Sequence, residues 1–309
     1  MERPLFLKKV SYKLLLLLPL ILVVAILLVF LLDFLLSKEV SKNKINDLSF
    51  QSSEISDYPL LKKGVVPKIT AGGAIVMDAN SKVVLYSKNP DLRFSLASTT
   101  KMMTALTALD YFKLDDILTV RVATKEGSLL GLRTGEQMTF ENLLYAMFLP
   151  SANDAAFTIA ENYPGGVQAF VQKMNDKAKE LKLYNTSYID PAGLLDEGDY
   201  TTPFDLARLA AFVSENDTLK RIVSTKQRLI TDVAGNQFNL NNLNQLLGFD
   251  GVNGIKTGTT AGAGEVLVTS KIKDGRTIII VVMESKDRFE DTQKLLDLVT
   301  NLNYLPIHL

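Results

Sequence analysis

A serine and a lysine, three residues apart, stand at the start of an apolar segment. Ser98 and Lys101 precede residues 102–109, whose composition predicts a helix. Residues three apart lie on the same face of a helix, so the hydroxyl and the amine should be neighbours. A serine hydroxyl is a weak nucleophile until a base removes its proton, and a lysine can be that base when its pKa is lowered. The pair therefore predicts a serine nucleophile activated by a lysine.

The composition of the 309-residue chain excludes the commoner catalytic bases. There is no cysteine, which excludes disulfides, zinc–cysteine sites and thiol catalysis, and the one histidine, His308, lies next to the C-terminal residue. A Ser-His-Asp triad would need its base on that tail, and a His-Glu-x-x-His zinc site cannot form. The formal net charge is zero, so no large basic surface indicates a nucleic-acid partner. We expect an enzyme that uses no metal and no other cofactor.

Two further short patterns follow the Ser-x-x-Lys pair. Residues 151–153 are Ser-Ala-Asn, and residues 256–258 are Lys-Thr-Gly within a run of strand character. Alone, each of the three patterns has an ordinary structural explanation: a helix N-cap before a solvated lysine, a turn, and a strand end with a glycine. Their occurrence together, in this order, is what indicates a site.

The N-terminal region predicts a membrane anchor. Residues 14–32 form an apolar run interrupted only by Pro19, and its length matches the hydrocarbon core of a bilayer. The run lacks the Ala-x-Ala cleavage pattern of a secretory signal peptide, which is the competing interpretation. Basic residues precede it and place the N-terminus in the cytoplasm and the remaining chain outside: Arg3, Lys8, Lys9 and Lys13.

The sequence therefore predicts three parts: a membrane anchor, an extracytoplasmic tether and a catalytic domain outside the cell membrane. Residues 1–37 hold a cytoplasmic basic stub and a single transmembrane helix. The polar residues 38–70 form an extracytoplasmic tether, and residues 71–305 form the catalytic domain.

Strand patterns stand at both ends of the predicted domain, with helical patterns between them. Apolar runs around a turn at residues 72–86 predict a β-hairpin, and three strand-like runs follow within residues 254–283. Helical spacing dominates the part between them and returns in a closing helix at residues 287–301. This segregation predicts an α/β protein of the α+β type: an antiparallel sheet of N- and C-terminal strands, flanked by helices, with a mostly helical insert.

The three patterns and their surroundings resemble one family. Ser-x-x-Lys, Ser-x-Asn and Lys-Thr-Gly, in this order, match the motif set of penicillin-binding proteins and β-lactamases. Residues 97–105, 149–156, 251–258 and 288–291 are similar to the serine D-alanyl-D-alanine carboxypeptidases, the low-molecular-weight penicillin-binding proteins of bacterial cell walls. The resemblance covers residues 65–304 and implies the penicillin-binding, β-lactamase-like fold.

The resemblance implies a role for each residue of the patterns. Ser98 would attack the carbonyl between two D-alanines, and Lys101 would be its base, with the charge of Lys256 lowering the pKa of Lys101. Ser151 would relay the proton to the leaving amine, and the backbone N–H groups of Ser98 and Thr259 would form the oxyanion hole. Five residues would bind the substrate: Asn153, Lys256, Thr257, Gly258 and Thr259. The implied partners are peptidoglycan stem peptides and, as covalent inhibitors, β-lactam antibiotics.

The resulting expectation is a membrane-anchored serine DD-carboxypeptidase that removes the terminal D-alanine from stem pentapeptides. A DD-endopeptidase that cuts cross-links would use the same machinery. A β-lactamase needs a carboxylate to activate the deacylating water, and no Glu-x-x-Leu-Asn pattern lies between Ser151 and Lys256. A non-catalytic wall-binding scaffold would not need the complete set of catalytic residues. Glu265, close to the predicted active strand, has no role in this scheme.

Overall fold

The computed structural model describes residues 57–61 and 66–306. The predicted transmembrane segment at residues 14–32 and most of the predicted tether lie outside these ranges. Within the described ranges, no helix combines the length and the apolar composition that a membrane crossing requires.

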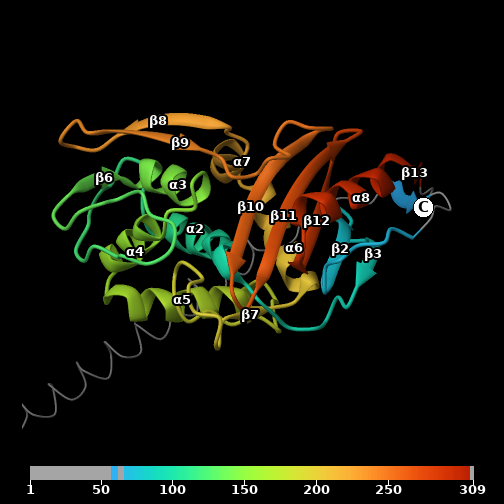
Figure 1. The fold of residues 1–309 in the computed structure, drawn as a ribbon, viewed down its shortest axis with the longest axis horizontal. Coiled ribbons are helices and arrows are strands. Elements are labelled where there is room, and N and C mark those ends of the chain that lie inside the picture. Colours follow the sequence, from blue (N-terminus) through green and yellow to red (C-terminus); the bar gives the residue numbers. More distant parts are fainter. Residues whose placement is uncertain (1–56, 62–65, 307–309) are drawn as a thin grey trace, which may run out of the picture. The chain divides into compact units, whose positions relative to one another are not determined.

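A five-stranded antiparallel sheet forms the centre of the fold, with strand order β10-β11-β12-β2-β3 (Figure 1). The strands are β2 (Gly73–Asp78), β3 (Val84–Lys88), β10 (Val252–Thr260), β11 (Gly264–Lys273) and β12 (Arg276–Ser285). β12 pairs with β2, so strands from the two ends of the domain are neighbours. The prediction of an antiparallel sheet built from N- and C-terminal strands is therefore confirmed.

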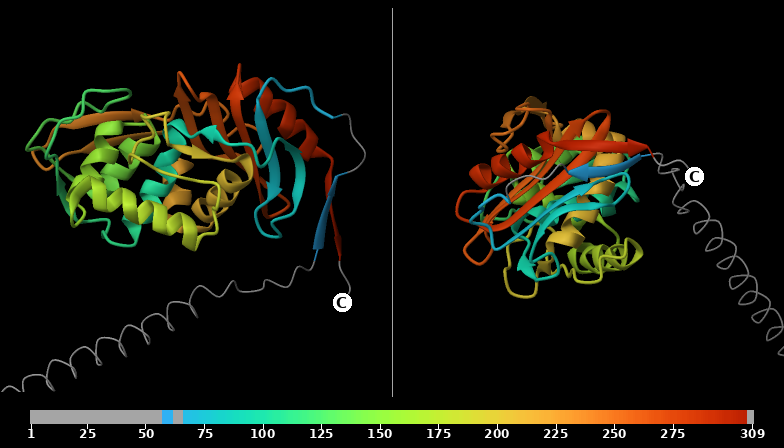
Figure 2. Two further views of the ribbon diagram at one scale, coloured as in Figure 1. Left: turned by 90° about the horizontal axis from the view of Figure 1, so that it is seen from below. Right: turned by 90° about the vertical axis from the view of Figure 1, so that its right-hand side faces the viewer.

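Helices cover both faces of this sheet because its strands are apolar on both sides. Residues 278–282 of β12 are all isoleucine or valine and all buried, and alternate side chains of a strand point to opposite faces. One set packs in a cluster with Leu295 and Val299 of α8 (Arg288–Thr300). The other set joins the main core, which includes the buried side of α6 (Pro203–Glu215). Figure 2 shows α8 and the helical region on opposite sides of the sheet.

A helical region lies between β3 and β10 in the sequence and packs beside the sheet. Its central helix is α2 (Lys101–Leu109), in which every residue except Leu109 is buried. Thr139 caps the N-terminus of α3 (Phe140–Phe148) by accepting a hydrogen bond from the N–H of Asn142 at 3.2 Å. The helices around α2 are α3 (Phe140–Phe148), α4 (Asn153–Asn162), α5 (Gly166–Glu180), α6 and α7 (Asp217–Val223).

Three small two-stranded sheets complete the helical region. They pair β4 (Phe94–Ser95) with β7 (Tyr200–Thr201), β5 (Ile117–Thr119) with β6 (Gln137–Thr139), and β8 (Gln227–Thr231) with β9 (Gln237–Asn241). The β8–β9 hairpin contacts α3 and extends along one side of the helical region (Figure 1). Neither this hairpin nor α7 was predicted from the sequence.

Strand structure is present before residue 71, the predicted start of the catalytic domain. β1 (Asp57–Leu61) falls in the range predicted as tether, yet it pairs antiparallel with β13 (Leu302–Pro306). Asp291 of α8 also accepts hydrogen bonds from the N–H groups of Thr70 and Ala71, both at 2.8 Å. These partners are more than 200 residues away in sequence, so the polar composition of this stretch did not reveal them.

Candidate active site

Ser98 and Lys101 lie where a 3₁₀ turn joins a helix. Ser98 is in the turn η1 (Ala97–Thr100), and Lys101 is the first residue of α2. Ser98 is partly exposed, whereas Lys101 is completely buried. Lys101 Nζ donates a hydrogen bond to Ser98 Oγ at 2.9 Å. The structure thus brings together the hydroxyl and the amine that the spacing pairs.

The Lys101 amine has two other hydrogen-bond acceptors. It donates to Asn153 Oδ1 at 2.6 Å and to the carbonyl oxygen of Ala192 at 2.8 Å. Burial lowers the pKa of Lys101 to about 7, although three carboxylates oppose this effect: Asp190, Asp154 and Asp199. A lysine with such a pKa can release and accept a proton near neutrality, as a general base must.

Ser151 occupies the turn between α3 and α4, with a positive φ of 65°. Its Oγ accepts a hydrogen bond from Lys256 Nζ at 2.9 Å, and the same amine donates to the carbonyl oxygen of Thr257 at 3.0 Å. Ser151 and Lys256 are 105 residues apart in the sequence. The fold thus brings the Ser-Ala-Asn turn into contact with the Lys-Thr-Gly strand.

Lys256 is also buried, and its pKa lies well below the ordinary value for lysine. Burial is the largest cause, and the positive charges of Lys101 and Arg288 add to it. Two buried amines that lower each other's proton affinity do not both stay ionised easily. Burial and both neighbouring cations therefore disfavour the charged form of Lys256.

Gly258 allows β10 to approach the turn that carries the serine. A Cβ atom at this position would lie 3.1 Å from Ala97 Cβ and 3.2 Å from the backbone nitrogen of Ser98. Thr259 follows directly on β10, so the two residues predicted to supply the oxyanion hole stand at this contact. Among the strands that the structure describes, β10 is also the outermost of the sheet, so one of its edges has no strand partner there.

Arg288 is a site residue that the sequence analysis did not assign. Its Nη1 donates to the carbonyl oxygen of Gly258 at 2.9 Å and to Thr259 Oγ1 at 2.5 Å. Its backbone N–H donates to Glu265 Oε2 at 2.9 Å, so Glu265 holds the first residue of α8 in place. This contact supplies a structural explanation for the acidic residue that the sequence left without a role.

The loop at residues 190–199 supplies one of the hydrogen-bond acceptors of Lys101, the carbonyl oxygen of Ala192. The Asp190 carboxylate accepts hydrogen bonds from four successive backbone N–H groups, at 2.6 to 3.1 Å: those of Ala192, Gly193, Leu194 and Leu195. Gly193 has φ of 73°, and a Cβ there would lie 1.9 Å from the carbonyl oxygen of Ala97. This tight turn directs the Ala192 carbonyl to the lysine.

Asp199 contacts the segment between the serine and the lysine. Its Oδ2 accepts a hydrogen bond from Thr100 Oγ1 at 3.0 Å, while its Oδ1 is buried and has no partner within the described residues. Burial, with a contribution from the Asp190 charge, raises the pKa of Asp199 to about 8. Neither Asp190 nor Asp199 belongs to a short motif, and the sequence analysis assigned a role to neither of them.

The site thus has two walls. The helix-side wall consists of η1, α2 and residues 190–199. The strand-side wall consists of β10 and Arg288. Ser151 and Asn153 connect them, since Ser151 bonds to Lys256 and Asn153 bonds to Lys101. All the sequence-predicted site residues lie in these walls or between them.

Comparison with known proteins identifies the family. Residues 62–287 match the family described as D-alanyl-D-alanine carboxypeptidase. The D-alanyl-D-alanine carboxypeptidase DacF of Bacillus subtilis is 36% identical over 238 residues, which are 74% of this chain and 61% of that protein. The D-alanyl-D-alanine endopeptidase of Pseudomonas aeruginosa is 33% identical over 255 residues, which are 77% of this chain and 79% of that protein.

Solved structures show the same fold. The crystal structure of the Streptomyces K15 DD-transpeptidase superposes with a TM-score of 0.72 at 32% identity, covering 76% of this chain and 98% of that chain. The predicted penicillin-binding-protein-like fold and the predicted family are therefore both confirmed. The chain belongs to the family of serine-type D-alanyl-D-alanine carboxypeptidases.

Proposed function

We propose that this protein is a serine DD-carboxypeptidase that removes the terminal D-alanine from peptidoglycan stem pentapeptides. The observation that carries the proposal is the 2.9 Å contact between Ser98 Oγ and the amine of Lys101. That amine is buried, and its pKa is lowered to about 7. A serine with such a neighbour can be deprotonated at the moment of attack.

In the acylation step, Ser98 Oγ attacks the carbonyl carbon between the two D-alanines while Lys101 Nζ takes the hydroxyl proton. The negative charge on the carbonyl oxygen is stabilised by the backbone N–H groups of Ser98 and Thr259. The C–N bond then breaks, and the proton that Lys101 took passes through the Ser151 hydroxyl to the leaving amine, which returns Lys101 to its neutral form, while Lys256 keeps its own proton and holds the Ser151 hydroxyl in place. Water later hydrolyses the ester on Ser98 and frees the enzyme.

The strand-side wall selects a peptide with a free C-terminal carboxylate. Lys256, Thr257 and Arg288 supply the cations and hydroxyl for this group, and the peptide backbone adds to the free edge of β10. The bound carboxylate raises the pKa of Lys256 and keeps it charged. A charged Lys256 in turn lowers the pKa of Lys101, so the correct substrate end helps to prepare the base.

Asn153 also helps to prepare Lys101 for the acylation step. Its Oδ1 accepts a hydrogen bond from Lys101 at 2.6 Å, and its Nδ2 donates to the carbonyl oxygen of Glu126 at 2.9 Å. One N–H of this amide stays available for the substrate amide. Asn153 therefore orients both the base and the peptide.

An endopeptidase activity on cross-linked wall peptides is the second candidate. The Pseudomonas aeruginosa relative carries the name D-alanyl-D-alanine endopeptidase, and both reactions cleave a bond that follows a D-alanine. Digestion of purified cross-linked dimers and of pentapeptide monomers, compared at equal enzyme concentration, separates the two.

The protein is further proposed to be anchored in the cell membrane by residues 14–32, with the catalytic domain outside. The apolar length of this run and the basic residues before it support the proposal. Residues 1–37 would form the stub and anchor, and a tether would connect them to the folded domain. A protease added to intact cells should digest the domain, and full protection would contradict the external placement.

Covalent labelling by a fluorescent penicillin tests the catalytic proposal. The wild-type chain should be labelled on Ser98 and should release D-alanine from a pentapeptide, whereas Ser98→Ala should do neither. Labelling or D-alanine release by Ser98→Ala would show that the nucleophile is another residue. A wild-type protein that neither labels nor releases D-alanine would favour a non-catalytic scaffold.

A further inference from the structure

The outward face of the β8–β9 hairpin is polar and uncharged. Alternate residues of the two strands are exposed on it: Gln227, Leu229, Thr231, Gln237, Asn239 and Asn241. In the strand register Gln227 stands opposite Asn241, Leu229 opposite Asn239 and Thr231 opposite Gln237. The face therefore carries amides along its whole length, one leucine in its middle and no ionisable group. We call it the amide face.

The side-chain amides of this face take no part in the hydrogen bonds of the described structure. In the part of the chain that the structure describes, four side chains make no hydrogen bond: Gln227, Gln237, Asn239 and Asn241. Asn242 and Asn244, just beyond β9, differ because each donates to backbone carbonyls and accepts from a backbone N–H. The fold thus fixes the base of the hairpin with two amides and leaves the amide face free for hydrogen bonding.

The opposite side of the hairpin packs against the helical region. The guanidinium of Arg228 stacks over the ring of Tyr145 at 3.9 Å from its centroid. Ile230 and Leu240 are buried in the main core. The amides are therefore displayed on an already ordered surface, which reduces the conformational entropy lost on binding.

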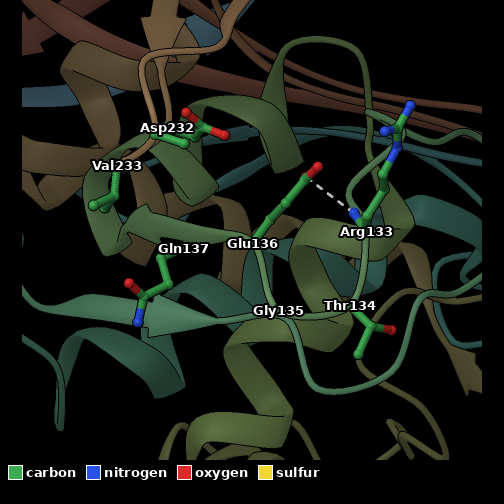
Figure 3. Close-up of a pocket in the computed structure, with 8 residues that line it drawn as sticks. Arg133, Thr134, Gly135, Glu136, Gln137, Asp232 and Val233 are labelled. Atoms are coloured by element: carbon green, nitrogen blue, oxygen red, sulfur yellow. Dashed lines mark hydrogen bonds between the residues drawn. The ribbon is translucent and has the colours of Figure 1, made fainter.

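Shallow hollows follow the hairpin. One of about 260 Å³ lies at its base and one of about 420 Å³ lies along its middle, and Gln227 and Asn241 line both of them. A third, of about 480 Å³, lies at the tip, where Asp232 and Val233 face the turn at residues 133–137 (Figure 3). A series of open hollows suits an extended chain better than a small compact molecule.

The base of the hairpin is bonded to the segments that carry the site. The N–H of Leu243 donates to the carbonyl oxygen of Leu149 at 3.2 Å, two residues before Ser151. Asn244 Nδ2 donates to the carbonyl oxygen of Gly254 at 3.2 Å, two residues before Lys256. The amide face is therefore anchored to both segments whose side chains meet at Ser151.

We propose that the amide face binds the glycan strand to which the stem peptide is attached, a neutral polysaccharide rich in hydroxyl and N-acetyl groups. This inference rests on the proposed function, because the glycan is the polymer that carries the proposed substrate. Side-chain amides both donate and accept hydrogen bonds, as sugar hydroxyls and acetamido groups require. The exposed Leu229 offers an apolar contact for the carbon face of a sugar ring. The six residues of the amide face are themselves uncharged, but Lys226 and Arg228 also line the hollows beside them, so the amides and Leu229, and not a lack of charge, select the glycan.

Retention of the full-length chain on insoluble glycan strands stripped of their peptides tests the proposal. The triple variant Gln227→Ala/Asn239→Ala/Asn241→Ala should be retained about tenfold less than the wild type, since several hydrogen bonds are lost together. The matched control replaces three exposed amides elsewhere that also make no hydrogen bond within the described residues: Gln168, Gln293 and Asn303. The control variant should be retained like the wild type.

A kinetic comparison separates this inference from the proposed function. The rate of D-alanine release is measured from pentapeptides on glycan strands and from the free pentapeptide, and the ratio of the two rates should fall about tenfold in the triple variant. Unchanged retention and an unchanged ratio would overturn the glycan site while leaving the carboxypeptidase proposal intact. A change of oligomeric state in the triple variant, measured by sedimentation, would show that the face binds a second copy instead. Failure of the wild type to cleave the free pentapeptide would count against the proposed function itself.

Discussion

The two buried lysines of the site have opposite electrostatic surroundings. Lys101, in the helix-side wall, is near three carboxylates, and its pKa falls to about 7 because burial outweighs them. Lys256, in the strand-side wall, is near two other cations, and burial and their charges both lower its pKa well below the ordinary value for lysine. Carboxylates of the protein therefore favour a proton on Lys101, whereas the charges that act on Lys256 are cationic, so an anion bound with the substrate would favour the charged form of Lys256.

Exchange of each lysine for arginine is the most severe test of this comparison. Arginine stays protonated near neutral pH, so Lys101→Arg removes the neutral base. The rate of Ser98 acylation should then fall by about 10²- to 10⁴-fold. Lys256→Arg keeps a cation in the strand-side wall and should lose much less. Stopped-flow acylation by a fluorescent penicillin measures both rates.

Thermal unfolding of both arginine variants shows whether each one still folds. Lys101→Ala provides a smaller replacement that also lacks the base and should show the same loss. Equal losses at the two lysine positions, in variants that remain folded, would contradict the division of roles.

The support behind Lys101 can be tested at Gly193. Gly193→Ala would place a Cβ 1.9 Å from the carbonyl oxygen of Ala97, so we expect a loss of about 3 kcal/mol or more in the free energy of unfolding. Gly135→Ala is the matched control, because Gly135 also has a positive φ but nothing lies within 4 Å of its Cβ position. That variant should lose only about 1–2 kcal/mol. Urea denaturation followed by circular dichroism measures both values, and similar losses would show that the contact is not rigid.

Arg288 tests the strand-side wall through the substrate. Loss of a hydrogen bond to a charged group costs about 1.5–3 kcal/mol, so Arg288→Ala should lower kcat/KM for a pentapeptide by about 10- to 150-fold. A peptide with a C-terminal amide lacks the carboxylate, and the variant and the wild type should cleave it at similar rates. Lys294→Ala, on the same helix in an exposed ion pair with Glu290, is the control. A uniform loss with both peptides would mean that Arg288 supports the fold of β10 and not carboxylate recognition.

Asp199 is expected to give the smallest effect, a shift of the pH profile. Acylation should rise with pH through about 7 as Lys101 loses its proton, and an ionised Asp199 raises the pKa of that lysine. Because burial raises the pKa of Asp199 to about 8, this carboxyl is mostly protonated at pH 7, so Asp199→Asn removes only a small part of a charge and should move the acid limb slightly to lower pH. The ionisable groups that interact electrostatically with Asp199 or Lys101 are Asp154, Asp190, Asp196, Tyr188 and Lys256.

Asp205 provides the control for this pH shift. Its carboxylate also has a pKa raised by burial, but it bonds to Asn185 and Thr186 and does not act on Lys101. Asp205→Asn should therefore leave the acid limb unmoved. An unmoved limb in Asp199→Asn would show that Asp199 stays protonated over the working pH range.

The sequence predicted the parts of the fold that depend on long local patterns. The strands within residues 254–283 are rich in β-branched residues, and their antiparallel pairing with residues 73–78 followed from their segregation at the two ends. The β8–β9 hairpin was missed, although Phe238 and Leu240 alternate with amides in a strand pattern. The pairing of β1 with β13 was also missed, because no local feature marks a partner at the far end of the chain.

The site shows the same division between local motifs and distant contacts. Ser98, Lys101, Ser151 and Lys256 stand in recognisable motifs, and the structure brings them together. Arg288, Asp190 and Asp199 act through contacts that join distant parts of the chain. The Thr100–Asp199 hydrogen bond, for example, spans 99 residues. Such residues have no spacing that distinguishes them from surface charges, so only the folded structure reveals them.

The pairing of β2 with β12 also fixes the order in which this molecule can become active. β2 is synthesised near residue 75, but its partner β12 and the lysine on β10 come some 180 to 210 residues later. A sheet with such distant pairings cannot close until nearly the whole domain has been made. The nucleophile at Ser98 therefore stays without the strand-side wall throughout most of synthesis, and the site assembles in one late step.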